Sequence, residues 1–270
     1  MSHRLITTLV SSRVVVSLFD QHSHYFKQLS QRPTRDRGAL ILEKLRSVAY
    51  DQQLSLTRES LRVFSQIEAF SFILDNATKL NFHSFKTAKV LFDSVINHQY
   101  QLRAQSGESL TAEELDNDAN LRLLYWVGFQ DTITTTGQLI KTLVRLHPQH
   151  RLQFVLDNLH KIKEFDAAME IYDRLFVDND DMGMVAPRSG LIENTGENRL
   201  AFAKAIRHTL TTPDACLTMS NLLNREHQLT FALWKLPYSP TPSLDKASRI
   251  LNHLKLSAPE LVDSSIVFHF

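Results

Sequence analysis

Apolar residues recur along most of this chain at the three- and four-residue spacing that is typical of amphipathic helices. The segment ALILEKLRSVAY places Leu42 and Leu45 on one such face. The segment FHSFKTAKVLFDSVINHQY does the same with Phe85, Ala88 and Leu91. The pattern therefore predicts an all-α protein in which long helices are joined by short polar connections.

Two long polar stretches interrupt the helical pattern. They lie near residues 104–112 and 178–197, and we expect both to be surface loops. After the first loop, Thr111 is expected to cap a helix, because Glu114 three residues later completes the pattern of a capping box. Pro148 is expected to close the helical segment that follows.

One phrase of the sequence occurs twice, as FILDNATKL at residues 72–80 and as FVLDNLHKI at residues 154–162. The similarity continues into the following segments, where two extra residues fall in the first turn and Ala88 matches Ala168. A small residue at this position lets a second helix cross the first closely, and the hairpin then has apolar surface on both sides. We therefore expect antiparallel helical hairpins stacked as a short right-handed α-solenoid, with the repeated Asp and Asn on the helix surface.

The composition agrees with this architecture and argues against catalysis. Of the 270 residues, 43% are hydrophobic and 22% are charged, and only 7 are glycine, so phosphate-binding loops are scarce. The chain contains neither a glycine-rich nucleotide motif nor an HExxH zinc motif. The pairs His22 and His24, and His147 and His150, have no third ligand nearby. We expect no catalytic residue, cofactor, metal or small-molecule substrate, and we expect the single cysteine, Cys216, to be buried.

Charge is unevenly distributed, although the formal net charge is only +1. Residues 1–37 form a basic segment, and the stretch before Asp20 contains arginine, serine and threonine without any carboxylate. This composition is typical of a mitochondrial presequence, and an ordinary first helix or strand is the alternative. The remaining helical-repeat domain, residues 38–270, is slightly acidic, and its acidic segment 108–118 suits a protein partner.

The segment VLDNLHKIKEFDAAMEIYDRL is similar to the pentatricopeptide repeat, a relative of the tetratricopeptide repeat. Lys161, Phe165, Ala168 and the pair Ile171–Tyr172 stand where the pattern of that family has them, and Lys163 replaces the turn glycine of the family.

Proteins of this family act mostly in mitochondria and chloroplasts, where they bind transcripts and support their translation, splicing, processing or stability. The resemblance implies RNA contacts from an early residue of the first helix in each hairpin, which is Gln153 in one copy and Ser71 in the other. The lysines near the ends of the same segments, Lys161 and Lys79, are further candidates for RNA binding.

Three functions stay open at this point. The leading hypothesis is a mitochondrial factor, in the matrix or on the matrix face of the inner membrane, that supports expression of an organellar mRNA by contacting that mRNA and/or the mitochondrial ribosome. The second is a non-catalytic interaction scaffold or assembly factor with tetratricopeptide-like helices, and the third is a bacterial helical adaptor or effector. A basic groove lined by the first helices would favour RNA, and an acidic or apolar groove would favour a protein partner.

Overall fold

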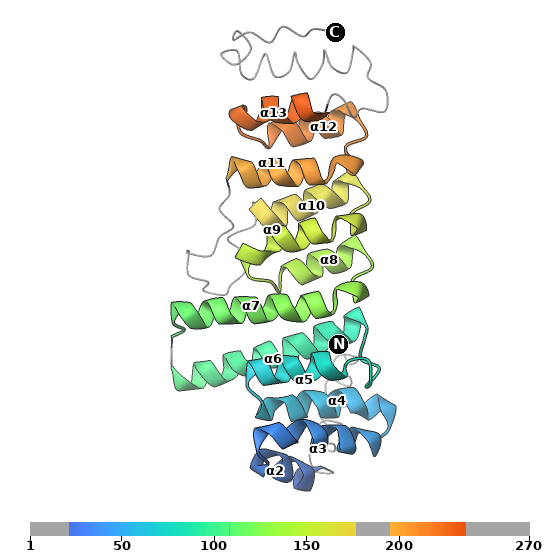
Figure 1. Ribbon diagram of the computed structural model, residues 1–270, viewed down its shortest axis with the longest axis vertical. Coiled ribbons are helices and arrows are strands. Elements are labelled where there is room, and N and C mark those ends of the chain that lie inside the picture. The colour runs from blue at the N-terminus through green and yellow to red at the C-terminus, as the bar shows by residue number, and fades with distance from the viewer. Residues whose placement is uncertain (1–21, 108, 177–194, 236–270) are drawn as a thin grey trace, which may run out of the picture. The chain divides into compact units, whose positions relative to one another are not determined.

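The computed structural model describes residues 22–107, 109–176 and 195–235, and all regular structure in these ranges is helical. No strand occurs in this part of the chain, so the all-α class predicted from the sequence is confirmed there. The chain divides into two compact units, Met1–Thr132 and Ile133–Phe270. The helices of both units are labelled in Figure 1.

In the first unit, helices pack in successive pairs and also contact the helix two further along the chain. α3 packs on α4 and α5 packs on α6, while α4 also contacts α6 and α5 also contacts α7. Two short 3-10 helices, η1 and η2, follow α4 and α7. The bounds are α2 (Ser23–Gln31), α3 (Thr34–Arg46), α4 (Tyr50–Ser60), η1 (Leu61–Val63), α5 (Gln66–Asn76), α6 (Phe85–Ser106), α7 (Ala112–Gly128) and η2 (Gln130–Thr132).

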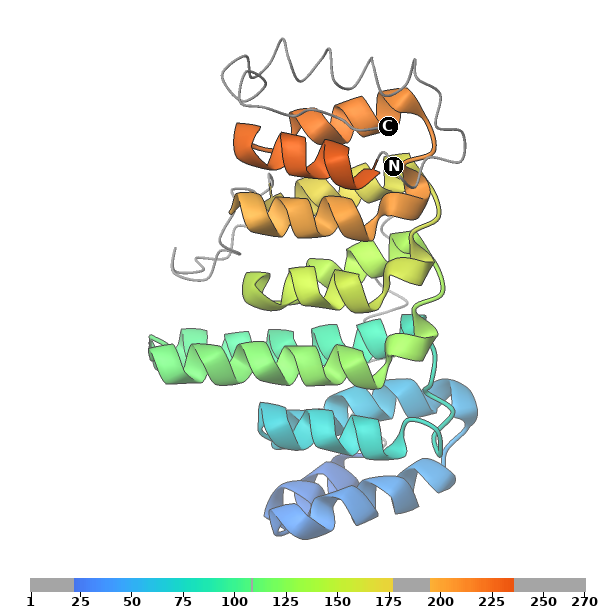
Figure 2. The same ribbon diagram turned by 45° about the horizontal axis from the view of Figure 1, so that its top comes forward.

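The second unit repeats this pairing. α9 packs on α10 and α12 packs on α13, while α8 contacts α10, α9 contacts α11 and α11 contacts α13. Figure 2 shows the paired helices of each unit from a second direction. The bounds are α8 (Thr136–Leu143), α9 (Pro148–Asp157), η3 (Leu159–Lys161), α10 (Phe165–Phe176), α11 (Gly196–Ala205), η5 (Arg207–Thr209), α12 (Pro213–Asn221) and α13 (Arg225–Lys235).

Aromatic side chains fill the core of the first unit between α5, α6 and α7. The ring of Tyr125 lies 4.6 Å from that of Phe70 and 5.3 Å from that of Phe92, measured between centroids. The Tyr125 hydroxyl donates a hydrogen bond of 2.8 Å to the carbonyl oxygen of Ala88, and burial raises the pKa of this tyrosine well above its ordinary value. A buried hydroxyl needs such a partner, so this bond fixes α7 against α6.

The small residues predicted at the helix crossings are fully buried in both copies. Ala88 on α6 and Ala168 on α10 are each inaccessible to solvent. In the second unit, Tyr172 stands one turn after Ala168 and packs its ring against Phe176 at 4.9 Å and Phe202 at 5.9 Å. The alanines therefore allow the close approach, and the aromatic rings fill the space beside it.

Local capping explains several helix starts. The Thr111 hydroxyl accepts a hydrogen bond from the backbone N–H of Glu114 at 3.2 Å, and the Glu114 carboxylate accepts one from the backbone N–H of Thr111 at 2.9 Å. The predicted capping box is thus confirmed, and these bonds to Thr111 hold the pKa of Glu114 below its ordinary value. The same reciprocal arrangement starts α5 at Ser65 and α8 at Thr135.

Several predicted boundaries differ from the structure. Pro148 does not close a helix but begins α9, where its missing N–H costs no helical hydrogen bond. The loop expected at residues 104–112 is shorter, because α6 continues to Ser106 and ends at Gly107 with a φ of 69°. The loop expected at 178–197 falls mainly on residues 177–194, which lie outside the described part of the chain.

The expected basic segment 1–37 overlaps the folded helices. α2 and the start of α3 lie within it, and Tyr25 and Leu29 on α2 are buried. The Tyr25 and Ser60 hydroxyls are hydrogen-bonded at 2.8 Å, and burial raises the pKa of Tyr25 to about 12. Of the predicted presequence, residues 1–21 lie outside the described residues.

Ala168 is fully buried on α10, which packs on α8 and α9. Ala168→Leu is expected to lower the free energy of unfolding by about 1–3 kcal/mol, because the added carbons force neighbouring side chains out of their rotamers. The matched variant Ala201→Leu, at an exposed position on α11, is expected to change it by less than about 0.5 kcal/mol. Urea unfolding measures both values, and equal losses would contradict the close crossing.

Candidate functional site

Two contacts fix how α5 and α7 lie beside each other. The Gln66 Nε2 group donates to Asp118 Oδ1 at 2.5 Å, and Leu74 packs directly against the Cα of Gly128. These contacts join the start of α5 to the first half of α7 and the end of α5 to the end of α7, so the two helices run in the same direction. Residue 71 therefore lies beside residue 124.

The two residues predicted to contact RNA are both exposed. Ser71 on α5 and Gln153 on α9 each precede a buried phenylalanine, Phe72 or Phe154. Because the phenylalanine is anchored in the core, the preceding side chain is directed outward along the same helix turn. By the register of α5 and α7, the corresponding position of α7 is Leu124, which is also exposed.

Gln153 is held in one orientation by its own helix. Its Nε2 group donates to Asp157 Oδ1 at 2.8 Å, one turn further along α9. Both side chains are exposed, and the bond leaves Gln153 Oε1 and the second carboxylate oxygen of Asp157 as acceptors facing solvent. Such a pair can accept hydrogen bonds from the amino groups of a nucleic-acid base.

Lys161 is buried, whereas a direct contact with RNA requires an exposed side chain. Its side chain is only 9% exposed, and its Nζ donates to Asn158 Oδ1 at 2.6 Å. Lys161 therefore stabilises the turn between α9 and α10 and is not presented to a ligand. Lys79, its counterpart after α5, is exposed.

The repeated asparagine is buried in both copies, which corrects the expectation that it lies on the helix surface. Asn158 Nδ2 donates to the Phe154 carbonyl oxygen at 2.8 Å, and Asn76 Nδ2 donates to the Phe72 carbonyl oxygen at 2.9 Å. Each buried amide nitrogen therefore has a partner, a carbonyl four residues earlier in the sequence. The neighbouring repeated aspartate is exposed, as expected, at Asp75 and Asp157.

Side chains from neighbouring helices close the turns in both units. In the second unit, the carbonyl oxygen of Lys161 accepts a bond from Thr136 Oγ1 at 2.7 Å, and that of Ile162 accepts one from His208 Nε2 at 2.5 Å. In the first unit, Arg37 and His98 donate to the carbonyls of η1 in the same way, at 2.5 Å and 2.9 Å. These bonds tie each turn to the helices beside it.

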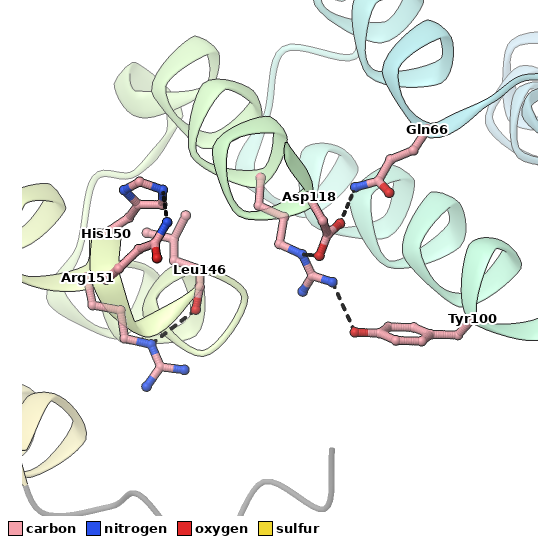
Figure 3. A network of polar contacts seen from close by, with 8 residues as sticks. Gln66, Tyr100, Asp118, Leu146, His150 and Arg151 are labelled. Atoms are coloured by element: carbon pink, nitrogen blue, oxygen red, sulfur yellow. Dashed lines mark hydrogen bonds and ion pairs between the residues drawn. The ribbon is translucent and has the colours of Figure 1, made fainter. Parts of the chain in front are cut away.

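A polar network links the three helices α5, α6 and α7 (Figure 3). Asp118 accepts from Gln66 and from Arg122 Nε at 2.8 Å, and Arg122 Nη2 donates to the Tyr100 hydroxyl at 3.0 Å. The Asp118 and Arg122 side chains are each only 11% exposed, so their charges neutralise each other and are largely hidden from solvent. The spacing of four residues is visible in the sequence, but the partners Gln66 and Tyr100 are not.

The first turn of α9 carries positive charge. Arg151 Nε donates to the Leu146 carbonyl oxygen at 3.1 Å (Figure 3). Burial, and to a lesser extent the charge of Arg174 on α10, lowers the pKa of Arg151, so two guanidinium groups lie near each other. Sequence analysis missed this pair, because residues 151 and 174 are brought together only by the antiparallel packing of α9 and α10.

The described residues contain no group of three His, Cys, Asp or Glu side chains that could hold a metal ion. None of the helices described is long and apolar enough to cross a membrane. Cys216 is buried, as predicted. Searches with protein-family models and against curated proteins returned no match for this chain.

The two buried asparagines offer a matched test of the turn. Asn158→Ala is expected to lower the free energy of unfolding by about 1 kcal/mol more than Asn76→Ala, because only Asn158 also accepts a bond from a buried lysine. Thermal or urea unfolding of the two variants measures the difference. A larger loss for Asn76→Ala would contradict the role assigned to the Asn158–Lys161 bond.

Proposed function

We propose that the helix pairs stack as a short right-handed α-solenoid and that the chain is a non-catalytic mitochondrial factor that binds single-stranded RNA. The RNA is an organellar mRNA whose translation, processing or stability the protein supports, with the mitochondrial ribosome as a further partner. Support for the stack comes from the contacts within the pairs α3–α4, α5–α6, α9–α10 and α12–α13, and from those between alternate helices such as α5–α7 and α9–α11.

The orientation of Gln153 is the observation that carries the RNA proposal. Gln153 Nε2 donates to Asp157 Oδ1 and both side chains are exposed, so Gln153 Oε1 and the second Asp157 oxygen can accept further hydrogen bonds. Sequence-specific RNA recognition uses hydrogen bonds to the edges of unstacked bases. Amino or ring N–H groups of a base can donate to these acceptors, and the second N–H of the Gln153 amide can donate to a base carbonyl.

The positive charge near the start of α9 adds affinity for the phosphate backbone. Arg151 and Arg174 lie in the same unit as Gln153, and the first turn of α9 contains no acidic residue. Each phosphate neutralised by such a group releases a bound counterion, which strengthens binding at low salt. Lys161 is left out of the proposal, because its ammonium group is held by Asn158.

Two variants of the full chain are expected to distinguish a base contact from a phosphate contact. Gln153→Ala is expected to weaken binding to a selected single-stranded RNA by about tenfold, about 1.4 kcal/mol, without changing its salt dependence. Arg151→Gln is expected to reduce the salt dependence. Fluorescence anisotropy at several salt concentrations measures both effects.

Gln149→Ala is the matched control, because Gln149 is an exposed glutamine one turn earlier on the same helix and bonds to His150 instead. It is expected to leave RNA binding unchanged. Equal affinities for wild type and Gln153→Ala, or binding that does not respond to salt, would contradict the RNA proposal.

Mitochondrial location is proposed from the basic, acid-poor start of the sequence. A fluorescent fusion that lacks residues 2–21 is expected to stay outside mitochondria while keeping the described helices intact. A full-length fusion with Arg4→Glu and Arg13→Glu is expected to behave in the same way, because the added acids remove the net positive charge. Import of either fusion, seen by microscopy and fractionation, would overturn the presequence proposal.

A further inference from the structure

In the first unit, α5 and α7 expose three large apolar side chains that do not belong to the buried core. Ile67 on α5 is 58% exposed, and Leu124 and Val127 on α7 are 60% and 48% exposed. Leu124 stands at the position that Gln153 occupies on α9. Because leucine has no hydrogen-bonding group, it cannot read a base as Gln153 can.

These side chains belong to one surface. Leu124 and Val127 are three residues apart on α7, so they lie on the same helix face. The register set by the Gln66–Asp118 bond and by the Leu74–Gly128 contact places α5 directly beside this face. Ile67 then lies about one helical turn before Leu124 on the neighbouring helix. We call this surface, made of Ile67, Leu124 and Val127, the α5/α7 face.

The charged groups exposed on α5, α7 and η2 themselves are all negative, whereas the exposed Lys79 follows α5 and the charge of Arg103 on α6 acts on Glu114. α5 contains no lysine or arginine, and the single arginine of α7, Arg122, is paired with Asp118 and only 11% exposed. The other charged groups that these two helices and η2 expose carry carboxylates. The exposed acidic residues are Asp75, Glu113, Glu114, Asp116 and Asp131.

An acidic surface with an apolar centre selects against RNA and for a cationic partner. Phosphate groups are repelled by exposed carboxylates, and binding of RNA requires positive charge. A partner that combines apolar side chains with lysine or arginine satisfies both parts of the face, through burial of apolar area and through charge attraction. The acidic groups also raise the association rate of such a partner through long-range electrostatic attraction.

The shape of the partner follows from the backbone. α5 and α7 satisfy their own backbone groups within each helix, so the face offers no strand edge to an extended peptide. A partner segment that docks there must satisfy its own backbone hydrogen bonds, and a helix does so. Anchors three or four residues apart on one side of that helix match the spacing of Leu124 and Val127.

We propose that the α5/α7 face docks an amphipathic helix of a protein partner, with its apolar residues on Ile67, Leu124 and Val127 and its lysines or arginines beside the surrounding carboxylates. None of these residues is among the proposed RNA contacts of α9, so either proposal can fail without the other.

The probe is a synthetic helical peptide of about five turns, with leucines on one face and lysines on the other, labelled for fluorescence anisotropy. The full-length protein is expected to bind it, and binding is expected to weaken as salt concentration rises, because exposed charges are screened. Leu124→Lys is expected to weaken binding by at least about tenfold, since it removes an apolar anchor and adds a repelling charge.

Leu102→Lys provides the matched control, because Leu102 is a 46% exposed leucine on α6 that lies outside the α5/α7 face. It is expected to leave peptide binding within about twofold of the wild-type value, because it removes none of the three apolar anchors of the face. Circular dichroism melting of both variants confirms that each is folded, because both positions are exposed.

Three results would overturn the proposal. One is equal binding of a peptide with the same composition but a scrambled order, which has no apolar face. Another is equal loss of binding in Leu124→Lys and Leu102→Lys. The last is RNA as the occupant of the face, seen as a change of RNA affinity in Leu124→Lys while peptide affinity stays unchanged.

Discussion

The buried amide of Asn158 determines how the α9–α10 hairpin is built and what it presents to solvent. Its nitrogen binds the Phe154 carbonyl and its oxygen binds the Lys161 ammonium, so one side chain joins the end of α9 to the following turn. Asn76 makes the first of these bonds in the other copy. With the turn fixed and Phe154 in the core, Gln153 has to face outward. The buried residues of the repeated segment therefore stabilise the hairpin, and the exposed residues beside them are available for binding.

The exposed positions of the first helices differ in chemistry between the two units. In the first unit they combine Ile67, Leu124 and Val127 with carboxylates, while the only arginine of α7 is neutralised in the network with Asp118. In the second unit the exposed amide of Gln153 lies on a helix whose first turn carries Arg151. Repeated hairpins keep their buried contacts and vary their exposed residues, so one chain can bind two different partners.

Local patterns in the sequence were sufficient for the helical class, for the capping box at Thr111 and for the buried alanines. They were not sufficient for the break at η1, because the apolar spacing continues across Leu61 and Phe64, and the 3-10 turn depends on bonds from Arg37 and other distant residues. The burial of Lys161 was also hidden, since a lysine is almost always a surface residue unless a partner is available. Contacts between helices far apart in sequence leave no periodic signal.

We propose that RNA binds exposed residues of α9, whereas exposed residues of α5 and α7 bind a protein partner. Photo-crosslinking of the full-length protein to single-stranded RNA that contains 4-thiouridine, followed by mass spectrometry of the peptides, tests it most directly. Crosslinks are expected within residues 148–157, around Gln153. Crosslinks concentrated within residues 66–76 or 112–128, with none on α9, would contradict it.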